Sequence, residues 1–180
     1  MSDPRCIPHD HLSPSDVSGL RTLFDAEYRR SHGEWDPDAP YGYAPADVHV
    51  IDGDDPVLAH VGFQRRAITV GDRTVVVGGT GGMLVAPSAR GARRGERVLR
   101  ELRAAMIDAD AEFGYLGCAP SVVPFYERAG WVRISPTEYH DDLAGRRVRE
   151  RDDSPIMICS ASRDASEWPE GDVDLHGRPW

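Results

Sequence analysis

The spacing of apolar side chains predicts three helices. Residues 14–30 carry apolar side chains at helical intervals, and Ser13 just before them is a favourable N-cap. A second helix is expected over residues 94–111, and a short one over residues 124–129, ending at Gly130.

Alternating or continuous apolar runs predict the strands of that sheet. The strands are expected at residues 47–51, 57–63, 67–70, 74–77, 83–86, 115–118 and 155–160. Gly71-Asp72 is a two-residue hairpin signal between two of them. The order of helix, antiparallel strands, then strand–helix–strand–helix predicts a mixed α/β fold in a single domain over residues 1–180.

Two segments without regular periodicity are still expected to pack. Residues 31–45 are rich in Gly, Pro and Asp and predict a loop, in which Trp35, Tyr41 and Tyr43 are costly to expose and should cover core or ligand. Residues 161–180 contain two tryptophans and are expected to form a packed C-terminal tail. We expect this tail to close a wall of the substrate pocket, with the terminal carboxylate of Trp180 facing a cation.

Composition narrows the class of function. The chain has 180 residues, 40% of them hydrophobic, and a net charge of −9, and all 21 of its basic residues are arginine. An acidic balance argues against nucleic-acid binding and suits a cationic substrate. The sequence has no apolar run of membrane-spanning length and no signal peptide, so a cytoplasmic location is expected.

The cysteines give no sign of a metal or disulfide framework. Cys6, Cys118 and Cys159 are far apart in sequence and form no paired motif. Cys118 is not accompanied by a histidine motif, so a nucleophilic cysteine is not favoured.

Charge is unevenly distributed along the chain. Residues 34–55 contain seven acidic residues and no arginine, whereas residues 90–103 contain six arginines. An acidic and a basic region in one small protein suggest two ligands of opposite sign.

The basic region begins at a predicted strand–loop–helix junction. Arginines at a helix N-terminus oppose the helix dipole, so Arg90, Arg93 and Arg94 there indicate a bound anion. Gly91 and Gly95 would let the backbone approach that anion closely. The alternative is a solvated basic turn.

This junction resembles the acyl-CoA motif Q/R-x-x-G-x-G/A of the GNAT acetyltransferases. Arg90 occupies the first position and Gly95 the last, while Arg93 replaces the middle glycine. The resemblance implies a GNAT fold, in which a mostly antiparallel sheet is flanked by helices and a splayed strand pair forms the acyl-CoA cleft. Acetyl-CoA would be the cosubstrate, with no metal. The residues implied to bind it are Met83, Leu84, Val85, Arg90, Gly91, Ala92, Arg93, Arg94 and Gly95.

A second segment strengthens the resemblance. Residues 124–131 read Pro-Phe-Tyr-Glu-Arg-Ala-Gly-Trp, similar to the F-Y-x-x-x-G-F/W segment of GNAT enzymes. The resemblance implies that Tyr126 is the general acid that protonates the departing CoA thiolate. Taken alone, a Phe-Tyr pair on a short helix is more often part of a core.

Two branches of the GNAT enzymes resemble the chain further. The aminoglycoside 2′-N-acetyltransferases, including a kasugamycin type linked to antibiotic resistance, share Ala59-His60, Gln64-Arg65-Arg66 and a C-terminal tryptophan. The nodulation N-acyltransferases, which acylate a free amine of chitin oligosaccharides, share Val70-Gly71 and the tail of residues 166–171. Both branches imply an amino-sugar acceptor, with the aminoglycoside as the preferred interpretation.

The general base is not defined by these motifs, because Gly81-Gly82 stands where common aminoglycoside 2′ enzymes carry a glutamate. The candidates are Glu34, Asp36, Glu138, His140, Asp152 and Asp153, and His140 has the most suitable intrinsic pKa. Direct loss of the proton to water is the alternative. The residues expected to bind the acceptor are Glu34, Trp35, Asp36, Gly81, Gly82, Asp153 and Trp180.

Some alternatives remain open from the sequence. A module that binds acetyl-CoA without transferring acetyl is the competing interpretation, against which the presence of Tyr126 argues. The exact acceptor, the acyl chain length and the oligomeric state, a homodimer included, are not determined by the sequence.

Overall fold

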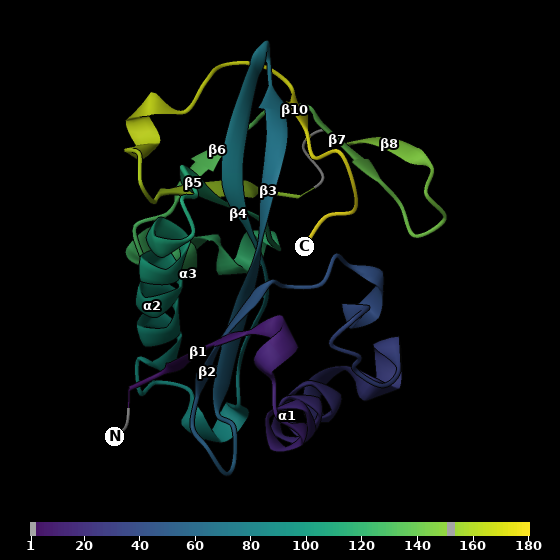
Figure 1. Cartoon of the computed structure of the whole chain (residues 1–180), viewed down its shortest axis with the longest axis vertical. Coiled ribbons are helices and arrows are strands. Elements are labelled where there is room, and N and C mark those ends of the chain that lie inside the picture. The colour runs from purple at the N-terminus through teal and green to yellow at the C-terminus, as the bar shows by residue number, and fades with distance from the viewer. Residues whose placement is uncertain (1–2, 151–153) are drawn as a thin grey trace.

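A long hairpin forms the centre of the computed structural model, which describes residues 3–150 and 154–180. Its strands are β3 (Ala59–Val70) and β4 (Arg73–Val85), joined by the predicted Gly71-Asp72 turn. Gly71 has a φ of +58°, a backbone conformation that glycine adopts without steric cost. Figure 1 shows the hairpin running through the length of the molecule.

The other strands extend this hairpin on both sides into one mostly antiparallel sheet. Its main order is β6-β9-β5-β4-β3-β10-β7-β8, with β2 also on β3 and β1 on β2. The β4–β5 and β10–β7 pairs are parallel. The remaining strands are β1 (Arg5–Pro8), β2 (Val48–Asp52), β5 (Phe113–Gly117), β6 (Val132–Ile134), β7 (Glu138–Asp141), β8 (Arg147–Glu150), β9 (Ile156–Ser160) and β10 (Val173–Asp174).

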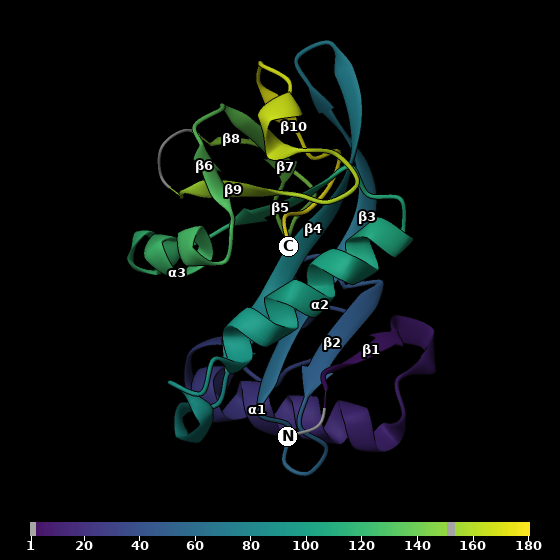
Figure 2. The same ribbon diagram turned by 90° about the vertical axis from the view of Figure 1, so that its left-hand side faces the viewer.

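Two long helices lie on opposite sides of the sheet. Helix α1 (Pro14–His32) begins with a capping box in which Ser13 and Asp16 bond each other's backbone. Figures 1 and 2 show α1 on one side of β2–β4 and α2 (Arg94–Asp108) on the other. A short helix, α3 (Val123–Arg128), follows β5. Single 3-10 turns lie at His9–His11, Pro40–Gly42, Pro87–Ala89, Pro120–Val122 and Ala165–Glu167.

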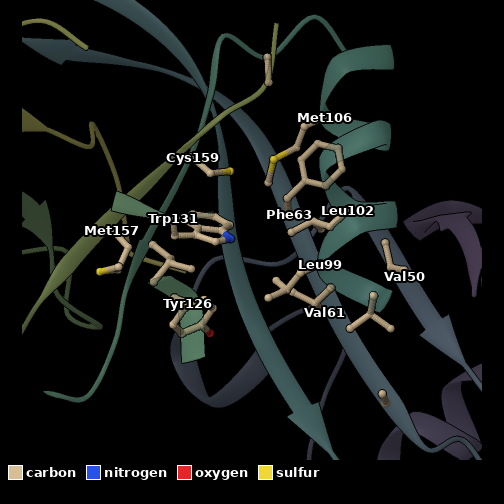
Figure 3. Packing of buried hydrophobic residues seen from close by; sticks show 14 residues of the cluster. Val50, Val61, Phe63, Leu99, Leu102, Met106, Tyr126, Trp131, Met157 and Cys159 are labelled. Carbon is tan, nitrogen blue, oxygen red and sulfur yellow. The ribbon is translucent and has the colours of Figure 1, made fainter. Parts of the chain in front are cut away.

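The largest core cluster lies between α2 and the sheet. Figure 3 shows Leu102 and Met106 of α2 facing Phe63 of β3, with Trp131 and Met157 on the opposite side. Each of these side chains is almost completely buried, so this cluster anchors α2 against the sheet.

The glycine-rich part of β4 differs from the sequence-based prediction. The chain was expected to leave the strand at Gly78–Gly82, but β4 is continuous there. Side chains from elsewhere fill the space that these glycines leave: a Cβ on Gly78 would lie 2.7 Å from Met106, and one on Gly79 2.0 Å from Trp180. Close approach of those side chains, rather than a loop, explains the glycines.

The tail closes against the hairpin turn. Strand β10 pairs with β3, and the Gly71 amide donates to the carbonyl of Asp172 at 2.9 Å. A Cβ on Gly171, whose φ is +128°, would lie 2.5 Å from the Gly71 Cα, so only glycine fits. Among residues 3–150 and 154–180, no helix is long and apolar enough to cross a membrane.

Candidate active site

A cleft of about 970 Å³ opens where β4 and β5 separate. The two strands pair only at Val77–Gly79 with Phe113–Tyr115. Beyond that point β4 continues towards α2, while residues 117–119 line the opposite wall. The loop of residues 90–95 at the start of α2 (the helix-start loop), α3 and Trp180 complete the lining, so the splayed strand pair expected from the sequence forms the cleft.

A β-bulge shapes the floor of the cleft. On β3, Val61 lies alone between His60 and Gly62, whereas Gly82 and Met83 lie between the corresponding partners on β4. Gly82 has a φ of +63°, as the first residue of a bulge with glycine in the left-handed region requires. The bulge interrupts the regular pairing of β4 at the wall of the cleft.

The predicted anion loop lies at the other end of the cleft. Helix α2 begins at Arg94, as predicted, and Arg93 before it has a φ of +55°. A Cβ on Gly91 would have open space, but one on Gly95 would lie 2.9 Å from the Phe125 ring. Gly91 therefore fits the predicted role of close approach, whereas Gly95 is needed for packing of α2 against α3.

The three arginines of this loop have different partners. Arg94 donates to Asp52 at 2.8 Å, and the Asp52 side chain is 1% exposed. Arg90 donates to the Val85 carbonyl at 3.2 Å and lies 3.4 Å from Glu27. Among the described residues, no hydrogen bond or ion pair involves the Arg93 side chain, although its carbonyl accepts the Arg97 amide at 3.1 Å. Asp52 thus supplies the anion that Arg94 was predicted to need. The Arg93 guanidinium remains available for an anionic ligand.

Tyr126 lies on α3 at the edge of the main core cluster and lines the cleft. Its ring packs edge-on against Trp131, and Figure 3 shows its hydroxyl directed away from that ring. Burial raises the pKa of Tyr126, so its phenol keeps its proton at neutral pH. A protonated phenol in a cleft can act as a general acid.

Cys118 lines the same cleft near Tyr126. Burial raises the pKa of its thiol, so the nucleophilic thiolate is disfavoured at neutral pH. The structure therefore agrees with the sequence in not favouring a cysteine nucleophile.

Trp180 forms part of the cleft wall opposite the loop. Its Nε1–H donates to the Oε1 atom of Gln64 at 3.1 Å, and the Arg66 guanidinium stacks 4.2 Å from its ring centre. The main-chain carbonyl carbon of Trp180 lies 2.8 Å from where a Gly81 Cβ would stand. Gly81 and Trp180, both predicted to bind the acceptor, therefore meet at one wall.

A second cavity of about 500 Å³ lies beside Trp180 and contains acidic groups. Nδ1 of His140 lies 3.0 Å from Oε1 of Glu138, whose other oxygen accepts the Tyr115 hydroxyl. Burial raises the pKa of Glu138, against the opposing effect of these two bonds. Glu150 completes a set whose ligand atoms lie within 4.8 Å of one another, and these are residue types that can bind a metal. The residues shared by the cavity and the cleft are Tyr43, Gly117, Cys118, Ala119 and Trp180.

Of the acceptor residues predicted in the loop of residues 31–45, Trp35 lines the cleft, whereas Glu34 and Asp36 do not. Trp35 is 2% exposed and stacks on Phe24 in the core. Glu34 is exposed and ion-paired with Arg21, and Asp36 caps its own loop by accepting the Asp38 amide. Loop composition alone could not separate core, surface and ligand roles. Asp153 and Asp152 lie outside the described residues.

Three histidines lie behind the bulge, and only His60 was noted from the sequence, as part of the shared Ala59-His60 pair. His9, His49 and His60 come from three separate elements, and His49 and His60 line the cleft. A strand's buried face is predicted from the alternation of its apolar residues. Histidines that meet across neighbouring elements do not contribute to that alternation, so the sequence pattern did not reveal their contact.

Comparison with solved structures identifies the fold. Escherichia coli ElaA is similar at 19% identity and a TM-score of 0.60, covering 88% of this chain and 98% of that one. A Brucella melitensis GNAT family acetyltransferase, solved in complex with acetyl-CoA, is similar at 18% identity and a TM-score of 0.58, covering 98% of this chain and 97% of that one. Escherichia coli YhbS, solved in complex with CoA, is similar at 16% identity and a TM-score of 0.62, covering 98% of this chain and 91% of that one. The fold is therefore the GNAT fold.

The family follows from the sequence. The profile of the family described as Nodulation protein A (NodA) matches residues 10–178. The chain belongs to the NodA family. A search of curated protein sequences gave no match.

Proposed function

We propose that the protein is an N-acyltransferase that transfers an acetyl group from acetyl-CoA to the amine of an amino sugar. The observation that carries the proposal is one cleft that joins a basic helix-start loop, a buried protonated phenol and an acidic cavity. An anionic donor and a cationic acceptor would thus meet between them. The NodA family and the GNAT fold support acyl transfer from an acyl-CoA.

The donor would bind with its pyrophosphate at the loop of residues 90–95. Free amides at the start of α2 attract an anion, and the Arg93 guanidinium adds a charge that no described side chain neutralises. The pantetheine arm would lie along residues 83–85 of β4, in the part of the cleft where β5 no longer pairs with that strand.

The reaction would be a direct displacement. The acceptor nitrogen attacks the thioester carbonyl, a C–N bond forms, and the C–S bond breaks. The departing thiolate takes the proton of the Tyr126 hydroxyl. A cationic amine loses one proton to a base before it attacks and a second as the amide forms, and the base passes both to solvent. Tyr126 regains its proton from solvent.

His140 is the proposed base. A neutral His140 that donates Nδ1–H to Glu138 has Nε2 free as an acceptor, the tautomer needed for a general base. Glu138 in turn is held by Tyr115, so the imidazole has a fixed orientation. The cavity that His140 lines adjoins the cleft at Trp180.

Two acceptors fit this chemistry. Glu138 and Glu150 beside Trp180 favour a polycationic aminoglycoside such as kasugamycin, whose acetylation at the 2′-amine would confer resistance. Membership of the NodA family favours a chitin oligosaccharide with one free amine. Both acceptors are amino sugars, so they share the same reacting group.

A thioester-release assay with acetyl-CoA and a panel of these sugars tests the proposal. CoA release that depends on kasugamycin, another aminoglycoside or a partly deacetylated chitin oligosaccharide supports it and ranks the acceptors. Tight acetyl-CoA binding without release for any amine would instead support a module that binds acetyl-CoA without catalysis.

A further inference from the structure

A continuous column of hydrogen bonds joins the surface to the floor of the cleft. Nε2 of His9 lies 2.9 Å from Oδ1 of Asp38, and Nδ1 of His9 lies 3.1 Å from Nε2 of His49. Nδ1 of His49 lies 2.9 Å from Nε2 of His60, and Nδ1 of His60 lies 2.8 Å from the Gly82 carbonyl oxygen. Every ring nitrogen of the three histidines is used.

The ends of the column fix the number of protons in it. A carboxylate and a carbonyl can only accept hydrogen bonds, so both end nitrogens must carry a proton. Each of the two internal bonds needs one further proton. Four protons on three imidazoles mean that one ring is an imidazolium and two are neutral.

Burial decides which ring is charged. The side chain of His9 is 28% exposed and lies against Asp38, whereas His49 and His60 are 2% and 3% exposed. A charge is least costly where solvent and a carboxylate reach it. His49 and His60 are therefore both neutral with the proton on Nδ1. The three bonds from His9 inwards donate towards Gly82, whereas Nε2–H of His9 donates outwards to Asp38.

The inner end of the column holds the bulge. The carbonyl of Gly82 belongs to the extra residue of β4, where strand pairing is irregular. A Cβ on Gly82 would lie 3.2 Å from Nδ1 of His60, so the glycine and the imidazole are in close contact. Phe24 packs edge-on against the same imidazole, with ring centres 5.3 Å apart.

We propose that the Asp38–His9–His49–His60 column is a positioning device that fixes the Gly82 bulge, with His60 as the residue that holds the cleft floor in its reactive shape. The column acts through the backbone of β4, at the part of the cleft that His49, His60 and Gly82 line. The predicted effect of the column on kcat rests on the proposed acyl transfer, but the predicted placement of protons on the three imidazoles does not.

Long-range ¹H–¹⁵N spectra of the histidine side chains test the proton order directly at mildly acidic pH. The expected result is Nδ1–H neutral tautomers for His49 and His60 and a doubly protonated His9. An Nε2–H tautomer at His60, or an imidazolium at either buried ring, would overturn the column. This measurement uses the unmodified protein and stands even if no acyl acceptor is found.

Matched variants test the positioning role. Asn at position 60 places an N–H near the Nδ1 position, whereas Leu has no donor, so His60→Asn should retain activity within several-fold and His60→Leu should lose it. The expected loss in kcat is about 10–100-fold, as a displaced reacting group gives, with the KM values changed less. The control is His11→Asn, because His11 is an exposed histidine in the same 3-10 turn as His9 and is not part of the column.

Equal kcat for His60→Leu and wild type, or equal damage in His60→Asn and His60→Leu, would refute the positioning role. If His60→Leu does not fold, His9→Leu at the exposed end gives the comparison. It should shift the His60 Nδ1–H resonance and lower kcat, and an unchanged resonance with unchanged kcat would count against the column.

Discussion

The guanidinium of Arg66 lies over the indole of Trp180, with its Cζ atom 4.2 Å from the ring centre. Arg66 also donates to Gln64, the residue that accepts the indole N–H. Its Nη1 atom donates to the carbonyls of Leu175 and Arg178, so one arginine of β3 ties down the tail. The wall of the cleft formed by Trp180 is therefore a rigid surface rather than a mobile end.

Replacing this indole is expected to weaken acceptor binding. Trp180→Ala should raise the acceptor KM by about tenfold or more, as loss of an aromatic anchor does, while acetyl-CoA affinity changes little. Steady-state kinetics with each substrate varied in turn measures the effect. Trp168→Ala is the control, because Trp168 packs on Phe113 and Tyr115 outside the cleft. A stability loss without a KM change in Trp180→Ala would make the tryptophan structural only.

Tyr126→Phe is expected to lower kcat by about 10²–10⁴-fold, the usual effect of removing a general acid. The substitution keeps the ring that packs on Trp131, so acetyl-CoA affinity and melting temperature should stay near wild type. Single-turnover kinetics together with calorimetry distinguish chemistry from binding. Wild-type turnover in the phenylalanine variant would remove Tyr126 from the mechanism.

The arginines of the donor loop are expected to differ. Arg93→Ala should weaken acetyl-CoA binding by about 10–100-fold through loss of one charge-assisted bond, with stability unchanged. Arg94→Ala should instead lower the free energy of unfolding by roughly 3 kcal/mol, because it takes a partner from buried Asp52. Calorimetry and urea unfolding of both variants give the comparison. The same response in both would contradict the division of roles.

Stability should fall on acidification because two histidines are buried in the neutral form. Burial lowers the pKa of His49 from 6.5 to about 3 and that of His60 to about 4. The unfolded chain therefore binds more protons below pH 6.5, so this stability is present above that pH and is lost as the pH falls towards about 4. The total is on the order of a few kcal/mol.

Urea unfolding across this range measures the effect. His60→Asn removes one of the two groups and should show a shallower loss of stability, while the control variant His11→Asn should follow wild type. Parallel pH profiles for wild type and His60→Asn would show that His60 is not buried as a neutral group.

The sequence predicted the elements that have local signals. The hairpin turn at Gly71-Asp72, the start of α2 at Arg94 and the short helix around Tyr126 lie where the pattern indicated. Capping residues, paired turn residues and helical repeats act within a few positions of the chain, so they can be read from it. The GNAT fold expected from the motif loop agrees with the solved structures.

Long-range features of the site could not be read in the same way. Gln64-Arg66 and Trp180 were noted as shared features of one branch, and Val70-Gly71 and the Gly171 segment of the other. No contact within either pair was predicted, yet each pair is in contact. Their contact depends on how β10 inserts beside β3, and no local pattern encodes that. The strands β7 and β8, which hold Glu138, His140 and Glu150, are short and rich in charge, and their alternation was missed.

The most direct test of acyl transfer is mass spectrometry of the acceptor after incubation with acetyl-CoA and the purified protein. The account predicts an amino sugar that gains one acetyl group as an amide, in step with CoA release, and a much slower gain with Tyr126→Phe. Acetyl-CoA that is bound but not consumed with every amino sugar, or an acetyl group found on oxygen rather than nitrogen, would contradict it.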